Sequence, residues 1–325
     1  MGTRLYNAVV VVFWMATMSW LLVDKLWPTL RVGDPPNYHS IIRYHSTGSK
    51  AEQGEAANAW AIYWNDHLAG WSLGKLVQRD TQMRELHSRL YIAELPLEQM
   101  VPHWLGGVIK PMLQQPGRLD MDMCGWLDID PLDRVVGFTS SMRLAGIKDA
   151  VTVNGMVSGN HLRLVAKSGD LSRETELPLA ADAWVGDGLS PQGYLPDLYQ
   201  GQTWSVCNYS LFHPASNPIE IIEARVEQHE PIVWDGASVK CWVVVYRGDA
   251  GSEMASEPQA KVWVRDDGRD NGLVLQQELW LFGSKLQFTR LTPERGRALR
   301  DEIKPYAKEE IPAETSRKLL QMIGG

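Results

Sequence analysis

The sequence predicts a mainly β protein made of two curved, half-barrel-like antiparallel sheets, preceded by an N-terminal transmembrane helix. Three observations predict this fold class. Short apolar and β-branched runs alternate with turn signals from residue 59 to residue 292. One amphipathic segment interrupts these runs in the first half, and we expect it to pack as a helix on a sheet. Nineteen uncharged residues stand between Arg4 and Asp24.

The uncharged run covers residues 5–23 and would span roughly 28 Å as a helix, which nearly matches a bilayer core. We interpret residues 1–28 as a signal anchor that holds the protein in the inner (cytoplasmic) membrane by a single pass, with the bulk of the chain exported to the periplasm. A cleaved signal peptide and a buried helix are the alternatives, although no A-x-A-like cleavage site follows the run. The orientation stays open, because Arg4 on one side competes with Lys25 and Arg31 on the other.

Composition limits the function classes. The chain has 325 residues, of which 44% are hydrophobic, so it can bury a substantial core. Its net charge of −7 and the absence of a dense Lys/Arg run exclude the electrostatic signature of a nucleic-acid-binding protein. Fourteen tryptophans against five phenylalanines favour strands, grooves and interfaces.

Turn signals and composition divide the rest of the chain into four parts. We predict a polar tether, a first β-rich domain, a second β-rich domain and two C-terminal helices, at residues 29–58, 59–184, 185–292 and 293–325. Trp126 and Trp263 each stand in a strand-like run that is followed by acidic residues, a turn and another strand. This similarity favours an internal duplication, and the alternative is that all β-hairpins share such a pattern.

The amphipathic segment, residues 96–113, offers candidate ligand-binding residues. Its apolar side chains recur at spacings of three and four and therefore share one helical face. Proline and glycine residues predict a kinked helix or two short ones. One interpretation is that the apolar face packs on a sheet. The other is that it lines an apolar pocket at the mouth of a curved sheet. The pocket candidates are Val101, Trp104, Leu105, Val108 and Met112.

The stretch Gly70-Trp71-Ser72-Leu73-Gly74 matches G-x-S-x-G, the pattern that carries the nucleophile of many serine hydrolases. A nucleophile elbow requires a strand, a sharp turn and then a helix. Here Asn65-Asp66 forms a turn before the motif, and an alternating strand follows it. We therefore interpret the motif as the second arm of a β-hairpin, with a catalytic Ser72 as the minor alternative.

No cofactor or metal site is predicted. The three cysteines, Cys124, Cys207 and Cys241, lack the spacing of a zinc site. Cys207 and Cys241 lie in strand-like runs and could form a disulfide in an exported domain, and three buried thiols are the alternative. The aspartates of "LDMDMCGWLDIDPLD" fit the wet face of a strand better than a calcium loop. The scattered histidines are expected to be solvated.

The second half, from Leu195 to Leu291, resembles a family of bacterial cell-envelope proteins of unknown function, which are similar in general appearance to lipoprotein-sorting factors. The resemblance rests on "LPDLYQGQTW", "ARVEQHEPI", "WDGASVKCWVVVY", "KVWVRDDG", "GLVLQQE" and "KLQFTRL". It implies a curved antiparallel half-barrel whose concave face holds an apolar ligand. It supplies no catalytic residues.

These observations favour a membrane-anchored, exported binding protein without enzymatic activity. Its expected ligand is an apolar or lipid-like molecule, or an envelope protein partner, and residues 5–23 hold it to the membrane. One alternative is a structural or accessory subunit of an inner-membrane complex. The other is a serine hydrolase that uses Ser72.

Overall fold

The computed structural model describes residues 58–78, 83–95, 119–132, 134–144, 147–178, 191–209, 219–248, 257–281, 283–303 and 311–324, together with Trp14, Thr17 and Met18. The strands of the first half are β1 Asn58–Trp64, β2 His67–Gln78, β3 Arg84–Leu95, β4 Leu119–Ile129, β5 Val135–Leu144, β6 Ile147–Ser158, β7 His161–Ser168 and β8 Leu171–Pro178. The second half contributes β9 Thr203–Tyr209, β10 Ile219–Trp234, β11 Ala237–Gly248, β12 Pro258–Arg265, β13 Val274–Leu281 and β14 Ser284–Arg290. Two helices follow, α6 Pro293–Ile303 and α7 Ala313–Gly324.

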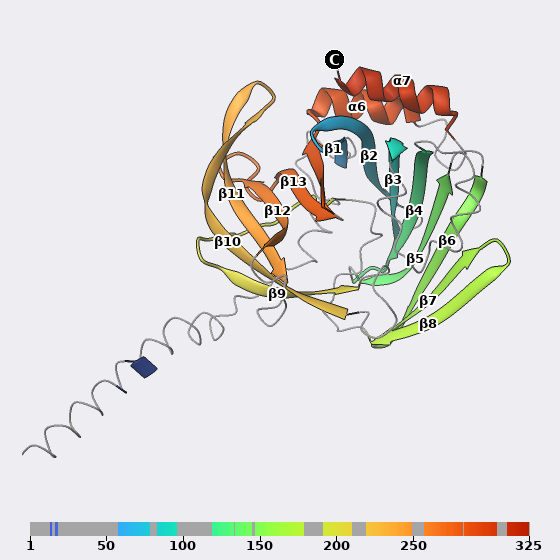
Figure 1. Cartoon of the computed structure of the whole chain (residues 1–325), viewed down its shortest axis with the longest axis horizontal. Coiled ribbons are helices and arrows are strands. Elements are labelled where there is room, and N and C mark those ends of the chain that lie inside the picture. The colour runs from blue at the N-terminus through green and yellow to red at the C-terminus, as the bar shows by residue number, and fades with distance from the viewer. Residues whose placement is uncertain are drawn as a thin grey trace, which may run out of the picture.

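All fourteen strands belong to one antiparallel sheet, in the order β8-β7-β6-β5-β4-β3-β2-β1-β14-β13-β12-β11-β10-β9. The mainly β, antiparallel fold class is confirmed, whereas the prediction of two separate sheets is wrong. The two halves join because β1 pairs with β14. Figure 1 shows the strands of the two halves on either side of β1, with α6 and α7 lying side by side above it. The sheet does not close, so β8 and β9 are its two edges.

The first hairpin follows directly from its sequence. Asn65 and Asp66 form the turn with φ of 47° and 66°, and both residue types tolerate this left-handed region. The register then places Trp60 opposite Ser72 and Ala61 opposite Trp71. The G-x-S-x-G stretch is therefore the second arm of a hairpin, as its sequence context predicts.

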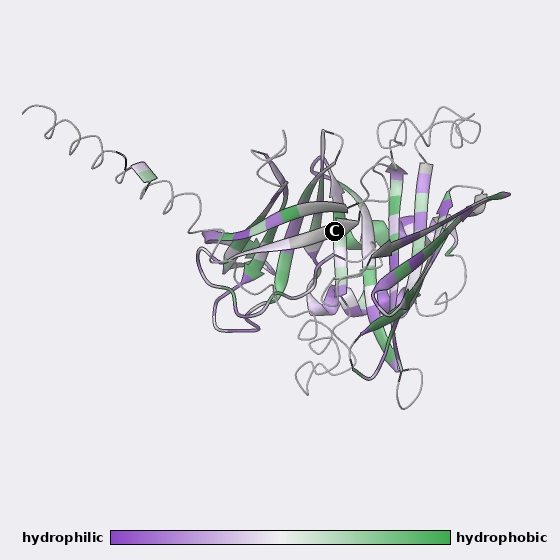
Figure 2. Cartoon of the chain, turned by 90° about the horizontal axis from the view of Figure 1, so that it is seen from below, coloured by the Kyte–Doolittle hydropathy of each residue, from purple (hydrophilic) through white to green (hydrophobic). Residues whose placement is uncertain are grey.

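The sheet has two faces that differ in what covers them. We call the face of Trp60 and Ile62 the inner face, and the face that carries α6 and α7 the outer face. The inner face holds the largest core cluster, which combines Leu90 and Met121 of the first half with Val244 and many other residues of the second. Figure 2 shows hydrophobic and hydrophilic residues alternating along the strands. This alternation follows from the two-residue period of a strand.

Residues 191–204, which we call the strap, run across the inner face of the second half. The strap is held by backbone hydrogen bonds from Leu195 N to Gly272 O (2.7 Å) and from Val226 N to Gln202 O (2.9 Å). Its side chains Leu195 and Trp204 are buried in the inner core cluster. The strap therefore fills the face on which the resemblance to half-barrel proteins predicts an apolar ligand.

Arg290, at the end of β14, ties the strap to the sheet. Its guanidinium donates hydrogen bonds from Nη2 to Gly193 O (2.8 Å) and from Nε to Val274 O (2.5 Å). A third bond runs from Nη1 to Asn58 Oδ1 (2.9 Å). The same group lies 4.4 Å from the ring centroid of Trp60, within the range of a cation–π contact. One buried side chain thus joins β1, β13, β14 and the strap.

The outer face carries one apolar cluster in each half, and the C-terminal helices cover the cluster over β1 to β3. Leu299 of α6 and Leu319 of α7 pack with Trp71 in one cluster. The β1 residues beneath them, Ala59 and Ala61, are small, which lets the helices come close to the sheet. Apolar side chains of the two C-terminal helices therefore cover β1 to β3.

Several predicted features lie outside the described residues. Of the predicted tether at residues 29–58, only Asn58 is described, as the first residue of β1, and the amphipathic segment 96–113 is not described. Within the predicted anchor, Trp14, Thr17 and Met18 are described, and all three are helical. Among the described residues, no helix is long and apolar enough to cross a membrane.

Arg290→Met should lower the free energy of unfolding by about 3 kcal/mol, because it leaves buried carbonyl and amide oxygens without their charged donor. Arg163→Met is the matched control, since Arg163 forms an exposed ion pair that solvent screens, and such pairs add little stability. Urea unfolding followed by tryptophan fluorescence measures both effects. Equal losses in the two variants would show that Arg290 does not hold the strap.

Candidate functional site

The predicted pocket residues cannot be placed. Val101, Trp104, Leu105, Val108 and Met112 all lie outside the described residues. Their role as pocket residues stays a prediction. The candidate site lies among the described residues.

Ser72 lies in the middle of β2, where only 1% of its surface is exposed. It stands between Trp60 of β1 and Leu90 of β3 in the strand register. The flanking Gly70 is needed for close packing, because a Cβ there would lie 2.1 Å from Tyr91 O. No helix follows the motif, since β2 continues to Gln78. Ser72 therefore lies in a core strand, without the sharp turn and the following helix that a nucleophile elbow requires.

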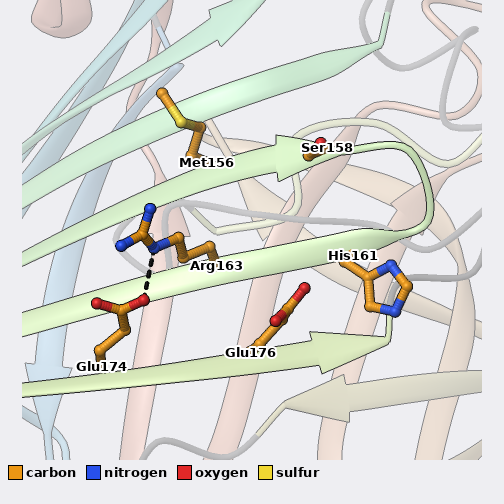
Figure 3. A pocket seen from close by; sticks show the side chains of 6 residues that line it. All are labelled: Met156, Ser158, His161, Arg163, Glu174 and Glu176. Atoms are coloured by element: carbon orange, nitrogen blue, oxygen red, sulfur yellow. Dashed lines mark hydrogen bonds and ion pairs between the residues drawn. The ribbon is translucent and has the colours of Figure 1, made fainter.

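A depression of about 430 Å³ lies on the outer face at the far end of the first half, over β6, β7 and β8 (Figure 3). Its lining residues are Met156, Ser158, His161, Arg163, Glu174 and Glu176. The register explains why three of them meet, because Met156 lies opposite Arg163 and Arg163 lies opposite Glu176. Three neighbouring strands therefore contribute to one surface.

The depression is polar and charged. Arg163 Nε donates to Glu174 Oε1 at 2.6 Å, and this exposed pair raises the pKa of Arg163 and lowers the pKa of Glu174. Glu176 points between Arg163 and His161 in Figure 3 and has no hydrogen-bonded partner among the described residues. Met156 adds an apolar wall and is 66% exposed. The site thus offers a carboxylate that has only an electrostatic contact with Arg163, together with one imidazole and a thioether.

Strand β8 forms the open edge of the sheet beside this depression. Every residue from Leu171 to Glu176 is exposed, and Leu171 is 60% exposed although it is apolar. Ser168 lies opposite Leu171 across a two-residue loop, which makes them a hydrogen-bonded pair. The ladder then alternates, so the backbone groups of Ser172, Glu174 and Glu176 point away from β7. The edge is therefore a row of available donors and acceptors.

Asp120 and Asp122 of β4 each pair with an arginine. Asp120 accepts from Tyr91 OH (2.9 Å) and from Arg317 Nη2 (3.1 Å). Burial, followed by the contact with Asp120, raises the pKa of Tyr91. Asp122 binds the guanidinium of Arg89. No group of three potential metal-ligating side chains occurs in the part of the chain that the structure describes.

Asp130, at the end of β4, organises the turn that follows. Burial raises its pKa, but hydrogen bonds from the Arg134 backbone and side chain and from Leu132 N outweigh burial and hold the pKa below its usual value. This aspartate is structural, because its local partners fix the turn after β4.

His229 belongs to a cluster that sequence patterns did not reveal. Its Nε2 shares a hydrogen bond of 2.8 Å with Asp266 Oδ2, and its ring stacks on Trp242 with centroids 3.3 Å apart. The expectation that His229 is solvated is wrong, because three-quarters of its side chain is buried. The contact joins β10 to the end of β12 beside the register shift between Val226 and His229. No spacing in the sequence signals such a pair.

The inner face of the first half is rich in methionine. Met123 of β4 lies opposite Met142 of β5, and Met121 lies opposite Leu144. Met123 and Met142 are only partly buried against the inner core cluster. Unbranched, polarizable side chains of this kind adapt their shape to irregular apolar partners.

The predicted Cys207–Cys241 disulfide is incompatible with the sheet. Cys207 lies opposite Ile221 and Cys241 opposite Glu230, so their partners on β10 are nine residues, or roughly 30 Å, apart. A disulfide requires Cα atoms within about 7 Å. Cys241 is a buried free thiol. Both strands are β-rich in sequence, but only the register shows that they flank β10 on opposite sides.

No family model and no curated protein matches the sequence. Among solved structures, the chain is similar to a β-barrel-like protein with a domain of unknown function, DUF1849, from Brucella abortus, with 8% identity, a TM-score of 0.42 and coverage of 73% of this chain and 95% of the other. It is also similar to the hypothetical lipoprotein YmcC from Escherichia coli K12, with 11% identity, a TM-score of 0.29 and coverage of 78% and 97%. A specific relation to lipoprotein-sorting factors is not confirmed.

Cys241 should resist alkylation in the folded protein. Burial raises the pKa of its thiol to about 12, so the reactive thiolate is scarce at pH 8. Iodoacetamide followed by peptide mass spectrometry should find Cys241 modified only after unfolding in urea. A peptide in which Cys207 is linked to Cys241, found without reduction, would contradict the register.

Proposed function

We propose that the chain is a membrane-anchored, exported binding protein that acts as an accessory subunit and docks an extended segment of a protein partner at the β8 edge. The observation that carries this proposal is the exposure of β8 from Leu171 to Glu176 beside a charged depression. An extended peptide can add to such an edge as a further strand, and its main-chain hydrogen bonds then supply affinity. The proposal extends the binding function that the sequence favours.

The side chains of β8 define which partner fits. Glu174 and Glu176 lie on the outer face, and Arg163 already pairs with Glu174. A basic residue of the added strand would meet Glu176 in the depression, because cross-strand opposite charges stabilise a pair. On the inner face, Leu171 offers an apolar contact. The partner segment therefore carries at least one Lys or Arg, with an apolar residue on its other face.

A second candidate is an apolar or lipid-like ligand on the inner face of the first half. It is favoured by the opposed pair Met123 and Met142, which is only partly buried. The strap fills the corresponding face of the second half, so this candidate is confined to the first half. Apolar ligand sites are lined mainly by such side chains.

Ser172→Pro should weaken the complex with the protein partner about tenfold, because it removes an edge N–H and places a ring in the path of the added strand. The pairing of β8 with β7 should persist, since Ser172 N–H points away from β7. Native mass spectrometry of full-length protein extracted from its own membranes measures the fraction that carries a partner chain.

The matched control is Ser172→Ala, which keeps the backbone N–H and should leave that fraction unchanged. Circular dichroism checks that both variants are folded. The edge is not the docking surface if folded Ser172→Pro retains as much partner as the natural chain.

Met142→Gln should reduce retention of an apolar ligand by roughly tenfold, because the amide must be desolvated against that ligand. Met156→Gln is the control, since Met156 is exposed on the outer face. The measurement is the lipid mass retained after detergent removal in native mass spectrometry. Retention that is unaffected by Met142→Gln excludes this face as the ligand site.

A further inference from the structure

A cluster of charged side chains on the outer face lies apart from the β8 edge. It occupies three neighbouring strands, with Arg89 on β3, Asp122 on β4 and Arg143 on β5. The register places Asp122 directly opposite Arg143. Two guanidiniums therefore approach one carboxylate from its two sides.

Arg89 uses both oxygens of that carboxylate. Its Nε donates to Asp122 Oδ1 at 3.0 Å and its Nη2 to Oδ2 at 2.6 Å, which is a bidentate fork. Arg143 reaches Asp122 only through Nη1 and Oδ2, at 3.7 Å. This distance is too long for a hydrogen bond, so Arg143 gains electrostatic attraction without a bonded acceptor.

Arg143 Nη1 is buried and has no hydrogen-bond partner among the residues that the structure describes. A buried charged donor without a hydrogen-bond acceptor lowers the stability of the fold, and folded proteins nearly always provide an acceptor for it. The other carboxylate nearby, Asp120, is already engaged by Tyr91 and Arg317. The described side chains thus leave the guanidinium of Arg143 with unused donors.

The location also allows an external acceptor to reach this group. The side chain of Arg143 is 18% exposed, against 8% for that of Arg89. Part of the Arg143 side chain therefore faces solvent, although Nη1 itself is buried. A small anion could replace water there and share the low-dielectric surroundings that strengthen a charge-assisted bond.

We infer that Arg143, supported by the Arg89–Asp122 pair, forms a binding site for a singly charged oxyanion, a carboxylate or phosphodiester group. One guanidinium charge lacks a bonded acceptor, which matches a single negative charge. The planar fork of arginine binds such oxyanions through two parallel hydrogen bonds. The role of Asp122 is to hold Arg89 in place and to limit the site to one charge.

The test uses the full chain in mild detergent and isothermal titration with acetate, dimethyl phosphate or chloride at constant ionic strength. Acetate or dimethyl phosphate should bind saturably and chloride should not. Arg143→Gln should weaken binding about tenfold, because the fork is lost. Arg247→Gln, which changes another arginine that has its own glutamate partner, should leave binding unchanged.

A gain-of-binding variant keeps the test independent of folding defects. Asp122→Asn removes a competing carboxylate and should tighten anion binding severalfold, and no loss of structure would produce that gain. Comparing binding to vesicles that contain phosphatidylglycerol with binding of soluble dimethyl phosphate shows whether the site prefers the phosphodiester of a lipid headgroup or a free anion. Equal binding by Arg143→Gln and the natural chain, or no saturable binding of either oxyanion, overturns the site.

Discussion

The pairing of β1 with β14 is the constraint on which the rest of the structure depends. It joins residues 60–64 to residues 286–290 and turns two meanders into one sheet. Trp60 and Arg290 face each other at this junction, and the guanidinium of Arg290 also holds the strap. If the junction opened, the inner core cluster would lose the contact between its two halves, and α6 would lose the β1 surface on which it packs. A contact across more than two hundred residues closes slowly, because the entropy of the intervening chain opposes it.

Local features of this fold could be predicted from the sequence, and its long-range pairings could not. The turn at Asn65-Asp66, the hairpin arm that contains Ser72 and the helices after Thr292 all follow from signals within a few residues. The joining of the halves has no such signal, because β1 and β14 are ordinary strands with ordinary alternation. Because the sequence carries no signal for long-range strand pairing, it also suggested a disulfide between Cys207 and Cys241. Strand content is a local property, but the number of strands between two cysteines is not.

The candidate sites were harder to foresee than the fold. The sequence patterns that indicate a site are contiguous, such as the apolar face of residues 96–113 or the run of aspartates. The structure instead assembles its charged clusters from residues on different strands. Arg89, Asp122 and Arg143 come from three strands, and His229 meets Asp266 from two. A pattern of period two reveals that such residues share a face, but only the register decides which of them touch.

If β8 docks a partner segment as proposed, its charges distinguish that segment from a second copy of β8. Open edges are aggregation hazards, and charged residues and proline are the usual protection. When two copies of β8 pair antiparallel with their outer faces aligned, even-numbered residues oppose one another. Glu174 then meets Glu174 or Glu176 of the other copy, and like charges placed directly opposite are destabilising. A strand with a basic residue at that position avoids this repulsion and gains a favourable pair. The same two glutamates therefore oppose pairing of β8 with another copy and would favour the basic partner segment of the proposed function.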